Sequence, residues 1–407
     1  MTLDEARALD AADPLRETRQ RFRLPEGKIY LDGNSLGALP LSTAGRIAGV
    51  VEREWGDDLI VSWNKHHWID APSRIAAKLA PIVGAGADEM LIADSTSVNL
   101  FKLLAAALAA RPGRTVILSD QGNFPADLYI AQGLARMLPG VTLRTVPADT
   151  IDQALDDQVA VLTLTQVDYR SGRRHDLAAR TAAAHRAGAL TLWDLSHSAG
   201  AIEIDLAGSA ADMAVGCGYK YLNGGPGAPA WLFIARALQD QLDNPLSGWM
   251  GHADPFAFDR AYAPRPGIAR FQTGTPSILA MTALDAGLDS FAGVKMAAIE
   301  AKARALTDYF IGCVEGRCPA LALASPRDAA KRGSHVVFAH ADAYAVMQAL
   351  IERGVIGDFR APDLIRFGFA PLYNGFDDAW RAADALSEVL DRKLWDVPRF
   401  KARARVT

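Results

Sequence analysis

Short apolar runs alternate with alanine-rich amphipathic stretches along the middle of the chain, from about Leu91 to Ile234. The runs, rich in β-branched residues, are TVILSD (115–120), VTLRTV (141–146), VAVLTLTQV (159–167), ALTLWD (189–194), DMAVGCGYK (212–220) and APAWLFI (228–234). The segments between them, such as DLAARTAAAHRAG (176–188), repeat apolar residues at helical spacing. Strands that are apolar on both faces and separated by helices predict a mostly parallel sheet with helices on each side.

A different pattern begins after about Phe291. The elements expected there are a helix over 294–310, a strand HVVFAH (335–340), a helix over 342–354, a strand LIRFGFA (364–370) and a helix from Asp377. They predict a smaller α+β domain. We expect three parts in all: an N-terminal segment, 1–60, that contributes to the small domain, a large domain over 61–290, and a small C-terminal domain over 291–407.

Composition narrows the class of protein. Hydrophobic residues make up 50% of the 407 residues and charged residues 22%, which excludes a disordered or fibrous chain. The net charge of -4 lacks the basic excess of a nucleic-acid binder, and the arginine-rich end, Lys401 to Arg405, is interpreted as a solvated end. No apolar run approaches the ~18 residues of a membrane span, and the acidic start lacks the apolar region of a secretory signal. We therefore expect a cytoplasmic enzyme with neither a nucleic-acid nor a membrane partner.

The first candidate catalytic residue is Lys220, at the end of an apolar run and just before the glycine-rich turn NGGPG (223–227). In an open parallel sheet, ligands bind where strands end, and a buried lysine without a partner is rare. One resolution is that this lysine forms an imine with an aldehyde cofactor. A lysine in a surface loop is the plain alternative.

A strand-end carboxylate precedes this lysine. ALTLWDLSHSAG ends a strand at Asp194 and places His197 three residues later. The cofactor pyridoxal 5′-phosphate (PLP) needs a carboxylate against its pyridine nitrogen, because the protonated ring accepts electrons from the substrate. Asp194 could instead cap a helix, and His197 could be a structural histidine. Together with Lys220, however, the pair favours PLP.

Two further segments supply groups that suit this cofactor. Ser95-Thr96-Ser97 opens a helix and offers backbone N–H groups and hydroxyls to a phosphate. Asn123-Phe124-Pro125-Ala126-Asp127 follows a strand and places an aromatic ring and a carboxylate at the same edge. Alone, the first is an ordinary helix cap and the second a turn with a core aromatic.

These segments together resemble the kynureninase family, of the bacterial type. The matching motifs are YLDGNSLG (30–37), STSVNLFKLL (95–104), NFPADLY (123–129), WDLSHSAGAIEIDL (193–206), CGYKYLNGGPGAPAWLFI (217–234), SGWMGH (247–252), FQTGTPSIL (271–279) and IRFGFAPLYN (365–374). The resemblance implies an α/β fold of the PLP-dependent transferase-like fold type I, as in the aspartate aminotransferase superfamily. It would have a mostly parallel seven-stranded sheet in the large domain and a smaller α+β domain.

The resemblance also implies roles for individual residues. PLP would be bound covalently through Lys220, with Asp194 at its pyridine nitrogen and Tyr219 as a proton donor and acceptor. The cofactor contacts implied are Thr96, Ser97, Phe124, Pro125, Ala126, Asp127, Thr165, Asp194, His197, Tyr219, Lys220, Trp249 and Thr275. The substrate contacts implied are Ser35, Trp63 and Arg366, with Arg366 gripping the α-carboxylate through a two-pronged contact.

The implied reaction is hydrolytic cleavage of the Cβ–Cγ bond of L-kynurenine, or of its 3-hydroxy form, to anthranilate or 3-hydroxyanthranilate and L-alanine. It belongs to tryptophan and kynurenine catabolism. Family members of the animal type carry an asparagine where this chain has Thr275, and a histidine in the region of Trp63. Thr275 and Trp63 therefore resemble the bacterial type, which favours unsubstituted L-kynurenine.

The resemblance further implies a homodimer in which Trp249 and Thr275 reach the partner's active site. The segment between them is rich in aromatic residues, proline and arginine, and aromatics and arginine are enriched at interfaces. A long loop packed on its own chain would carry the same residues. Two-fold symmetry is the commonest for soluble oligomers.

Other functions fit the sequence less well. A cysteine desulfurase or class V aminotransferase would share the fold, but a desulfurase needs a mobile nucleophilic cysteine. Cys217 lies at a strand end, where we interpret it as a small buried residue. The simplest interpretation of Cys313 and Cys318 is that they are ordinary cysteines at the end of a helix. The three cysteines have no CxxC spacing, so neither disulfides nor a metal site are expected. A non-catalytic PLP-fold binding protein would be expected to lack Lys220 or Asp194, and a dinucleotide-binding oxidoreductase would need a GxGxxG motif that opens a helix.

Overall fold

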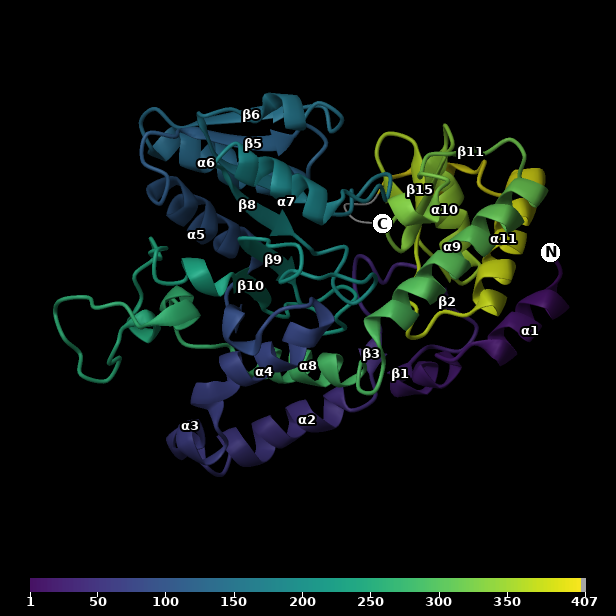
Figure 1. The fold of residues 1–407 in the computed structure, drawn as a ribbon. Coiled ribbons are helices and arrows are strands. Elements are labelled where there is room, and N and C mark those ends of the chain that lie inside the picture. Colours follow the sequence, from purple (N-terminus) through teal and green to yellow (C-terminus); the bar gives the residue numbers. More distant parts are fainter. Residues whose placement is uncertain (404–407) are drawn as a thin grey trace.

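The structure is a computed structural model that describes residues 1–403. Of the arginine-rich end, Ala404 and Arg405 lie outside the described residues. Within 1–403, no helix is long and apolar enough to cross a membrane. Figure 1 shows a large domain around a central sheet, with a smaller domain, drawn in green and yellow, beside it.

The central sheet has seven strands, as expected. Their spatial order is β4 (Met90–Ile92), β10 (Ala230–Ile234), β9 (Met213–Cys217), β8 (Leu190–Asp194), β7 (Val159–Thr165), β5 (Val116–Asp120) and β6 (Thr142–Val146). Within this sheet only β10 runs antiparallel to its neighbours. Because β10 lies between β4 and β9, β4 points the same way as the five parallel strands. The carboxyl ends of six strands therefore meet at one edge of the sheet.

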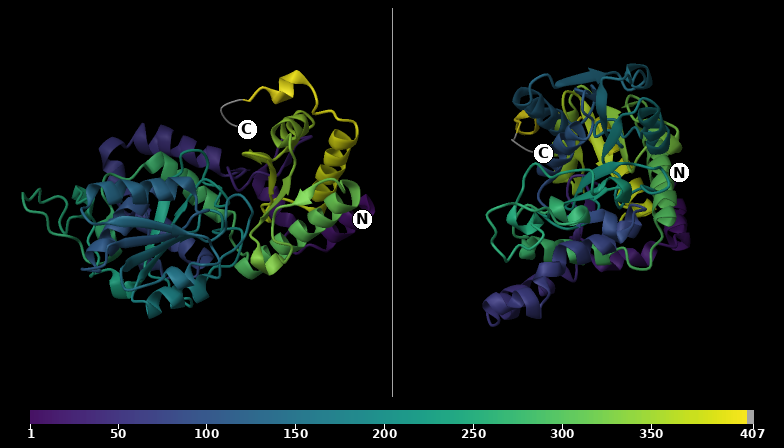
Figure 2. Two further views of the ribbon diagram at one scale, coloured as in Figure 1. Left: turned by 90° about the horizontal axis from the view of Figure 1, so that it is seen from above. Right: turned by 60° about the vertical axis from the view of Figure 1, so that its left-hand side comes forward.

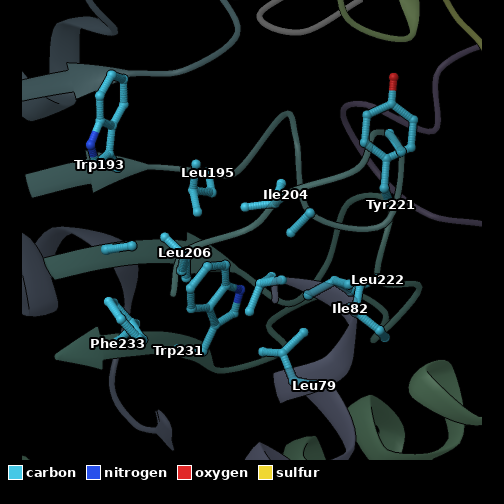
Figure 3. Close-up of a cluster of buried hydrophobic side chains, with 14 of the residues drawn as sticks. Leu79, Ile82, Trp193, Leu195, Ile204, Leu206, Tyr221, Leu222, Trp231 and Phe233 are labelled. Atoms are coloured by element: carbon cyan, nitrogen blue, oxygen red, sulfur yellow. The ribbon is translucent and has the colours of Figure 1, made fainter. Parts of the chain in front are cut away.

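Helices cover both faces of this sheet, since its central strands are buried throughout. The helices of the large domain are α2 (Thr43–Gly49), α3 (Ser62–Lys65), α4 (Ala71–Leu79), α5 (Thr96–Ala109), α6 (Pro125–Met137), α7 (Leu177–Arg186) and α8 (Ile278–Asp289). Side chains of α5 and α6 share one apolar cluster with the strands. Side chains of α4, α7 and α8 join a second cluster on the other face. Figure 3 shows part of this second cluster, which includes Trp231 of β10, Leu206 and Leu222.

The small domain has its own sheet and its own core. Four antiparallel strands lie in the order β11 (Ala322–Leu323), β12 (His335–Ala339), β15 (Leu364–Gly368) and β14 (Asp358–Arg360). The helices are α9 (Met296–Arg317), α10 (Ala343–Glu352), α11 (Phe376–Asp391) and α12 (Pro398–Lys401). The sequence predicted β12, β15 and the three longer helices, whereas β11 and β14 are too short to show a pattern.

The N-terminal segment is shared between the two domains. The helix α1 (Leu3–Ala12) packs on α11, whose first N–H groups, from Phe376 and Asp377, donate to the Asp10 carboxylate at 2.7 and 2.9 Å. The short strand β2 (Ile29–Tyr30) pairs with β13 (Val355–Ile356) of the small domain. Farther on, β1 (Phe22–Arg23) pairs with β3 (Leu39–Pro40), and α2 packs on α8 of the large domain. The expected domain boundaries at residues 60 and 290 stay a prediction.

Two segments project from the body of the large domain. One is the loop over 253–263, drawn in green at the left of Figure 1, and the other is the arm that ends in α3. Both stand out again in the turned views of Figure 2. Each exposes apolar side chains, with Ile60 and Phe258 both 77% exposed. Apolar side chains gathered on projecting segments are typical of a surface that another molecule covers.

Candidate active site

Most of the predicted cofactor residues come together because the strand ends meet at one edge of the sheet. Thr165 ends β7 and pairs directly with Asp194, the last residue of β8. Lys220 follows the end of β9, next in the sheet. The helix α5 begins after β4, which ends at the same edge. One sheet edge thus gathers residues that lie 125 positions apart in sequence, from 95 to 220.

Alternation along the strand sets the direction of the Asp194 side chain. Trp193 and Leu195 belong to the apolar cluster of α4 and α8, and successive strand residues point to opposite faces. Asp194 therefore points toward α5 and α6, where Asp127 lies in the first turn of α6. The Thr165 hydroxyl donates to Asp127 Oδ2 at 3.0 Å.

The two carboxyl groups form a buried acidic pair. Asp127 is 3% and Asp194 4% exposed. Burial and the nearby charge of Asp194 raise the pKa of Asp127 well above its usual value. Burial also raises the pKa of Asp194, opposed by hydrogen bonds from Ser196, whose N–H and hydroxyl donate to Oδ1 at 2.9 and 2.6 Å. No ion pair of Asp127 or Asp194 with a basic side chain is found within the described residues. Buried carboxyl groups in this situation favour the binding of a cation.

Lys220 lies beside an aromatic ring at this site. Its Nζ is 5.7 Å from the centre of the Phe124 ring and 5.9 Å from that of Tyr219. Within the described residues, no hydrogen-bond acceptor or ion-pair partner of this nitrogen is found. Burial raises the pKa of Tyr219 well above its usual value, so its phenol carries a proton at neutral pH.

His197 is a buried histidine at the same edge, 4% exposed, with its Nδ1 unpaired within the described residues. Burial and the nearby Lys220 lower its pKa well below the usual value. Its ring contacts that of His335 edge-on, at 5.5 Å between centres. His335 belongs to β12, so this contact joins the large domain to the small one.

The start of α5 provides the anion-binding groups expected. Ser95 caps the helix and accepts from the N–H of Val98 at 3.3 Å. Thr96 and Ser97 follow as the first helical residues and are half-buried. A helix N-terminus of this kind favours a phosphate.

These groups fit PLP when they are taken together. The buried acids would hold the protonated pyridine nitrogen, and Phe124 offers its ring as a stacking surface. Thr96 and Ser97 would hold the phosphate, and the amine of Lys220 would bind the aldehyde carbon. The unpaired nitrogen of His197 supplies one further polar contact.

Arg366 lies in β15 and is fully buried. Its Nη1 donates to the carbonyl oxygen of Tyr169 at 2.7 Å, and Nη2 donates to the Ser35 hydroxyl at 3.0 Å and to Asp358. With its amide oxygen toward the arginine, Asn34 accepts from Nε at 3.1 Å. Four of the five N–H groups of the guanidinium are thereby bonded, so a two-pronged contact with a substrate requires one of these acceptors to give way.

The YLDGNSLG motif connects this arginine to the lysine. Ser35 and Asn34 bond to Arg366, while Gly37 donates its N–H to the carbonyl of Tyr219 at 2.8 Å. A Cβ at Gly37 would lie only 2.4 Å from the backbone oxygen of Lys220. The glycine is therefore required by the close approach of two chain segments.

Trp63, Trp249 and Thr275 lie together elsewhere in the chain. They line a hollow of about 620 Å³ with Ile60 and Phe256, and Lys220 is not among the residues that line it. The Trp249 ring packs edge-on against Phe256, at 5.7 Å between centres. None of the predicted contacts at the sheet edge, such as Asp194 and Phe124, lines this hollow either.

Comparison with known proteins identifies the family. The kynureninase of Deinococcus radiodurans is 54% identical over 96% of this chain and 97% of its own length. That of Pseudomonas fluorescens is 50% identical over 100% of both chains. Residues 299–386 also match the family model described as the kynureninase C-terminal domain. The chain belongs to the kynureninase family.

Solved structures with the same fold are more distant in sequence. A cysteine desulfurase from Thermococcus onnurineus NA1 has a TM-score of 0.78 at 19% identity and covers 92% of this chain and 98% of its own. A variant of C-DES, a cystine C–S lyase, with glycine linked covalently to its PLP cofactor, has a TM-score of 0.79 at 18% identity, over 90% of this chain and 98% of its own. These likenesses confirm the fold class. All three cysteines of this kynureninase family member are free and buried.

Sequence reasoning missed several residues near the site. Tyr169 lies four residues after the end of β7, and its ring packs edge-on against Phe124 at 5.2 Å. The rule that ligands bind at strand ends could have found it. Asp358 pairs directly with Arg366 across two strands, but β14 has only three residues and shows no pattern in the sequence.

The acidic pair makes a prediction about the cofactor-free protein. A carboxyl group whose pKa is raised by folding binds its proton more tightly in the folded state, so ionising it costs folding free energy. The cost is absent below the unfolded pKa of about 3.9 and grows as the pH rises toward the folded pKa. The Asp127→Asn substitution removes this cost, and the amide oxygen of the asparagine can still accept the hydrogen bond from the Thr165 hydroxyl. We expect the melting temperature to rise relative to the wild type by roughly 1–3 °C more at pH 9 than at pH 5.

Thermal unfolding of the stripped protein, followed by circular dichroism, measures this difference. The exposed Asp157→Asn serves as the control and should change little between the two pH values. If the melting temperatures of Asp127→Asn and the wild type differed by the same amount at pH 5 and pH 9, the proposed cost of ionising the acidic pair would be contradicted.

Proposed function

We propose that this protein is a PLP-dependent kynureninase that hydrolyses L-kynurenine to anthranilate and L-alanine. The observation that carries this function is the combination of full-length identity above 50% to a kynureninase with Lys220 and the acidic pair at one sheet edge. The three buried free cysteines suit a reducing compartment, which supports the cytoplasm as its location.

The chain's residues divide the work of the reaction. Bound at Lys220, PLP withdraws electrons from the bonds at the substrate's α-carbon. Asp194 would hold the proton on the pyridine nitrogen, and Asp127 would stay protonated beside it because two buried acids repel each other when both are ionised. Phe124 and Tyr169, whose rings pack edge-on at 5.2 Å, would cover one side of the cofactor ring.

Lys220 and Tyr219 move the protons. The amine of Lys220, when it is free, would remove the proton from the substrate's α-carbon and return it during product release. The phenol of Tyr219 donates a proton to the carbon left behind when anthranilate departs, since its raised pKa keeps it protonated. A water molecule attacks the γ-carbonyl, and the proton that this water gives up as the Cβ–Cγ bond breaks and the carboxyl group of anthranilate forms returns to the oxygen of Tyr219.

Arg366 binds the substrate α-carboxylate in this proposal. Its guanidinium is held by the small domain and contacts the large one through the Tyr169 carbonyl. Trp63 and Thr275 would border the aromatic ring of the substrate. Because they offer an indole and a short hydroxyl in place of longer polar groups, we expect unsubstituted L-kynurenine to be the preferred substrate.

The Lys220→Ala variant tests the catalytic assignment. It removes the amine that binds the cofactor and moves the proton, so we expect anthranilate release to fall below detection and the visible absorbance of the bound cofactor to vanish. Anthranilate release is measured by its fluorescence after purified protein is incubated with PLP and L-kynurenine. A parallel incubation with 3-hydroxykynurenine measures which of the two substrates is preferred. Normal turnover by the variant would refute the role of Lys220, and absence of anthranilate from the fully loaded wild type would refute the function.

The active unit in this proposal is a homodimer with shared sites. Trp63, Trp249 and Thr275 line a hollow apart from the Lys220 of their own chain, with exposed Ile60 and Phe256 around it. Placed against the partner's site, they would complete it, and their apolar surface would be covered. Cofactor that binds across the boundary also stabilises the dimer by mass action.

Ile60→Asp tests this assembly. A charge in an apolar interface is costly to desolvate, so we expect the variant to be largely monomeric at low micromolar concentration and to have lost activity. Light scattering gives the mass. Met137→Asp, at a similarly exposed residue at the end of α6, is the control and should stay dimeric. A monomeric, PLP-loaded wild type with full activity would rule out shared sites.

A further inference from the structure

Two arginines and an aspartate gather on one face of the small domain's sheet. Asp358 of β14 lies directly opposite Arg366 of β15. Arg360 lies two positions after Asp358, so strand alternation puts it on the same face. Its Nη2 is 2.7 Å from Asp358 Oδ2, the same oxygen that Arg366 contacts.

Asp358 is the anchor of this group. It is 2% exposed, and besides the two arginines it accepts from the Ser35 hydroxyl at 3.0 Å. Ser35 in turn accepts from Arg366. The aspartate thus restrains Nη2 of the Arg366 guanidinium both directly and through Ser35. Nη1 donates one N–H to Tyr169, and its second N–H is still available to a substrate.

Charge balance favours an additional anion beside this group. Two guanidinium groups converge on one carboxylate. The neighbouring Asp32 compensates only in part, because burial and the charge of Asp358 raise its pKa to about 7. A substrate carboxylate at Arg366 would offset the remaining positive charge. Arg360 would then keep Asp358 paired while Arg366 shares its charge with the substrate.

We propose that Asp358 and Arg360 form a positioning pair for the substrate carboxylate: Asp358 fixes the guanidinium of Arg366, and Arg360 holds Asp358. Neither residue touches the substrate. The inference rests on the proposed role of Arg366 and adds a residue pair that sets how tightly this arginine binds a carboxylate. Pre-oriented donors bind more tightly because less conformational freedom is lost on binding.

Binding of two small amines separates this role from general damage. L-Alanine carries a carboxylate, and 2-aminopropane has a methyl group in its place. Both are titrated into PLP-loaded protein and followed by the absorbance of the bound cofactor. For Asp358→Asn and Arg360→Gln, we expect L-alanine to bind about tenfold more weakly, equivalent to 1.4 kcal/mol, with 2-aminopropane unchanged. With L-kynurenine, KM should rise by a similar factor while kcat changes by less than about threefold.

The double variant tests whether Arg360 acts through Asp358. Since both substitutions disrupt the same contact with Arg366, we expect the double variant to bind L-alanine about as weakly as Asp358→Asn alone. Arg399→Gln is the control, because Arg399 pairs with Glu352 on the exposed surface of the same domain. Should Asp358→Asn fail to fold, Arg360→Gln decides alone, since Arg360 is partly exposed.

Three outcomes would overturn the positioning pair: unchanged binding of L-alanine, equal weakening of both amines, or additive losses in the double variant. Failure of the proposed function is a separate result. It would appear as a wild type that binds L-alanine through its cofactor and releases no anthranilate from L-kynurenine.

Discussion

The structure around Lys220 depends on two buried carboxyl groups that repel each other. Asp127 and Asp194 come from different elements, and the sheet forces them together because α6 covers the face to which Asp194 points. Their raised pKa values record a cost that the folded chain carries without the cofactor. A protonated pyridine nitrogen bound at this pair would offset that cost, so the burial of the two acids would supply part of the affinity for PLP.

The sheet edge explains why much of the site could be predicted from the sequence. Asp194 and Lys220 were predicted because each ends an apolar run, and parallel strands bring such positions together whatever their spacing along the chain. Thr165 lies at the same edge, but it was expected only from the family resemblance. The direction of a side chain also follows from alternation, as Asp194 shows. The parallel sheet flanked by helices was predicted from local patterns, whereas its seven strands were expected from the family resemblance that the short motifs carry.

Other parts of the site depend on contacts that no local pattern records. Trp63, Trp249 and Thr275 form a hollow of their own, and within one chain they do not border the residues around Lys220. Asp358 and Arg360 lie in a strand too short to recognise, and their importance depends on Arg366 being its cross-strand neighbour. The GNSLG motif was noticed for its resemblance alone. Its physical reason, the approach of Gly37 to Lys220 and of Ser35 to Arg366, required the fold.

The central claim is that the cofactor is held by Lys220 beside the acidic pair. Reduction of the PLP-loaded protein with borohydride fixes the cofactor on the lysine that holds it, and mass spectrometry of the digested protein then locates it. We expect one phosphopyridoxyl group per chain, on the peptide that contains Lys220. The label on another lysine, with Lys220 unmodified, would contradict it.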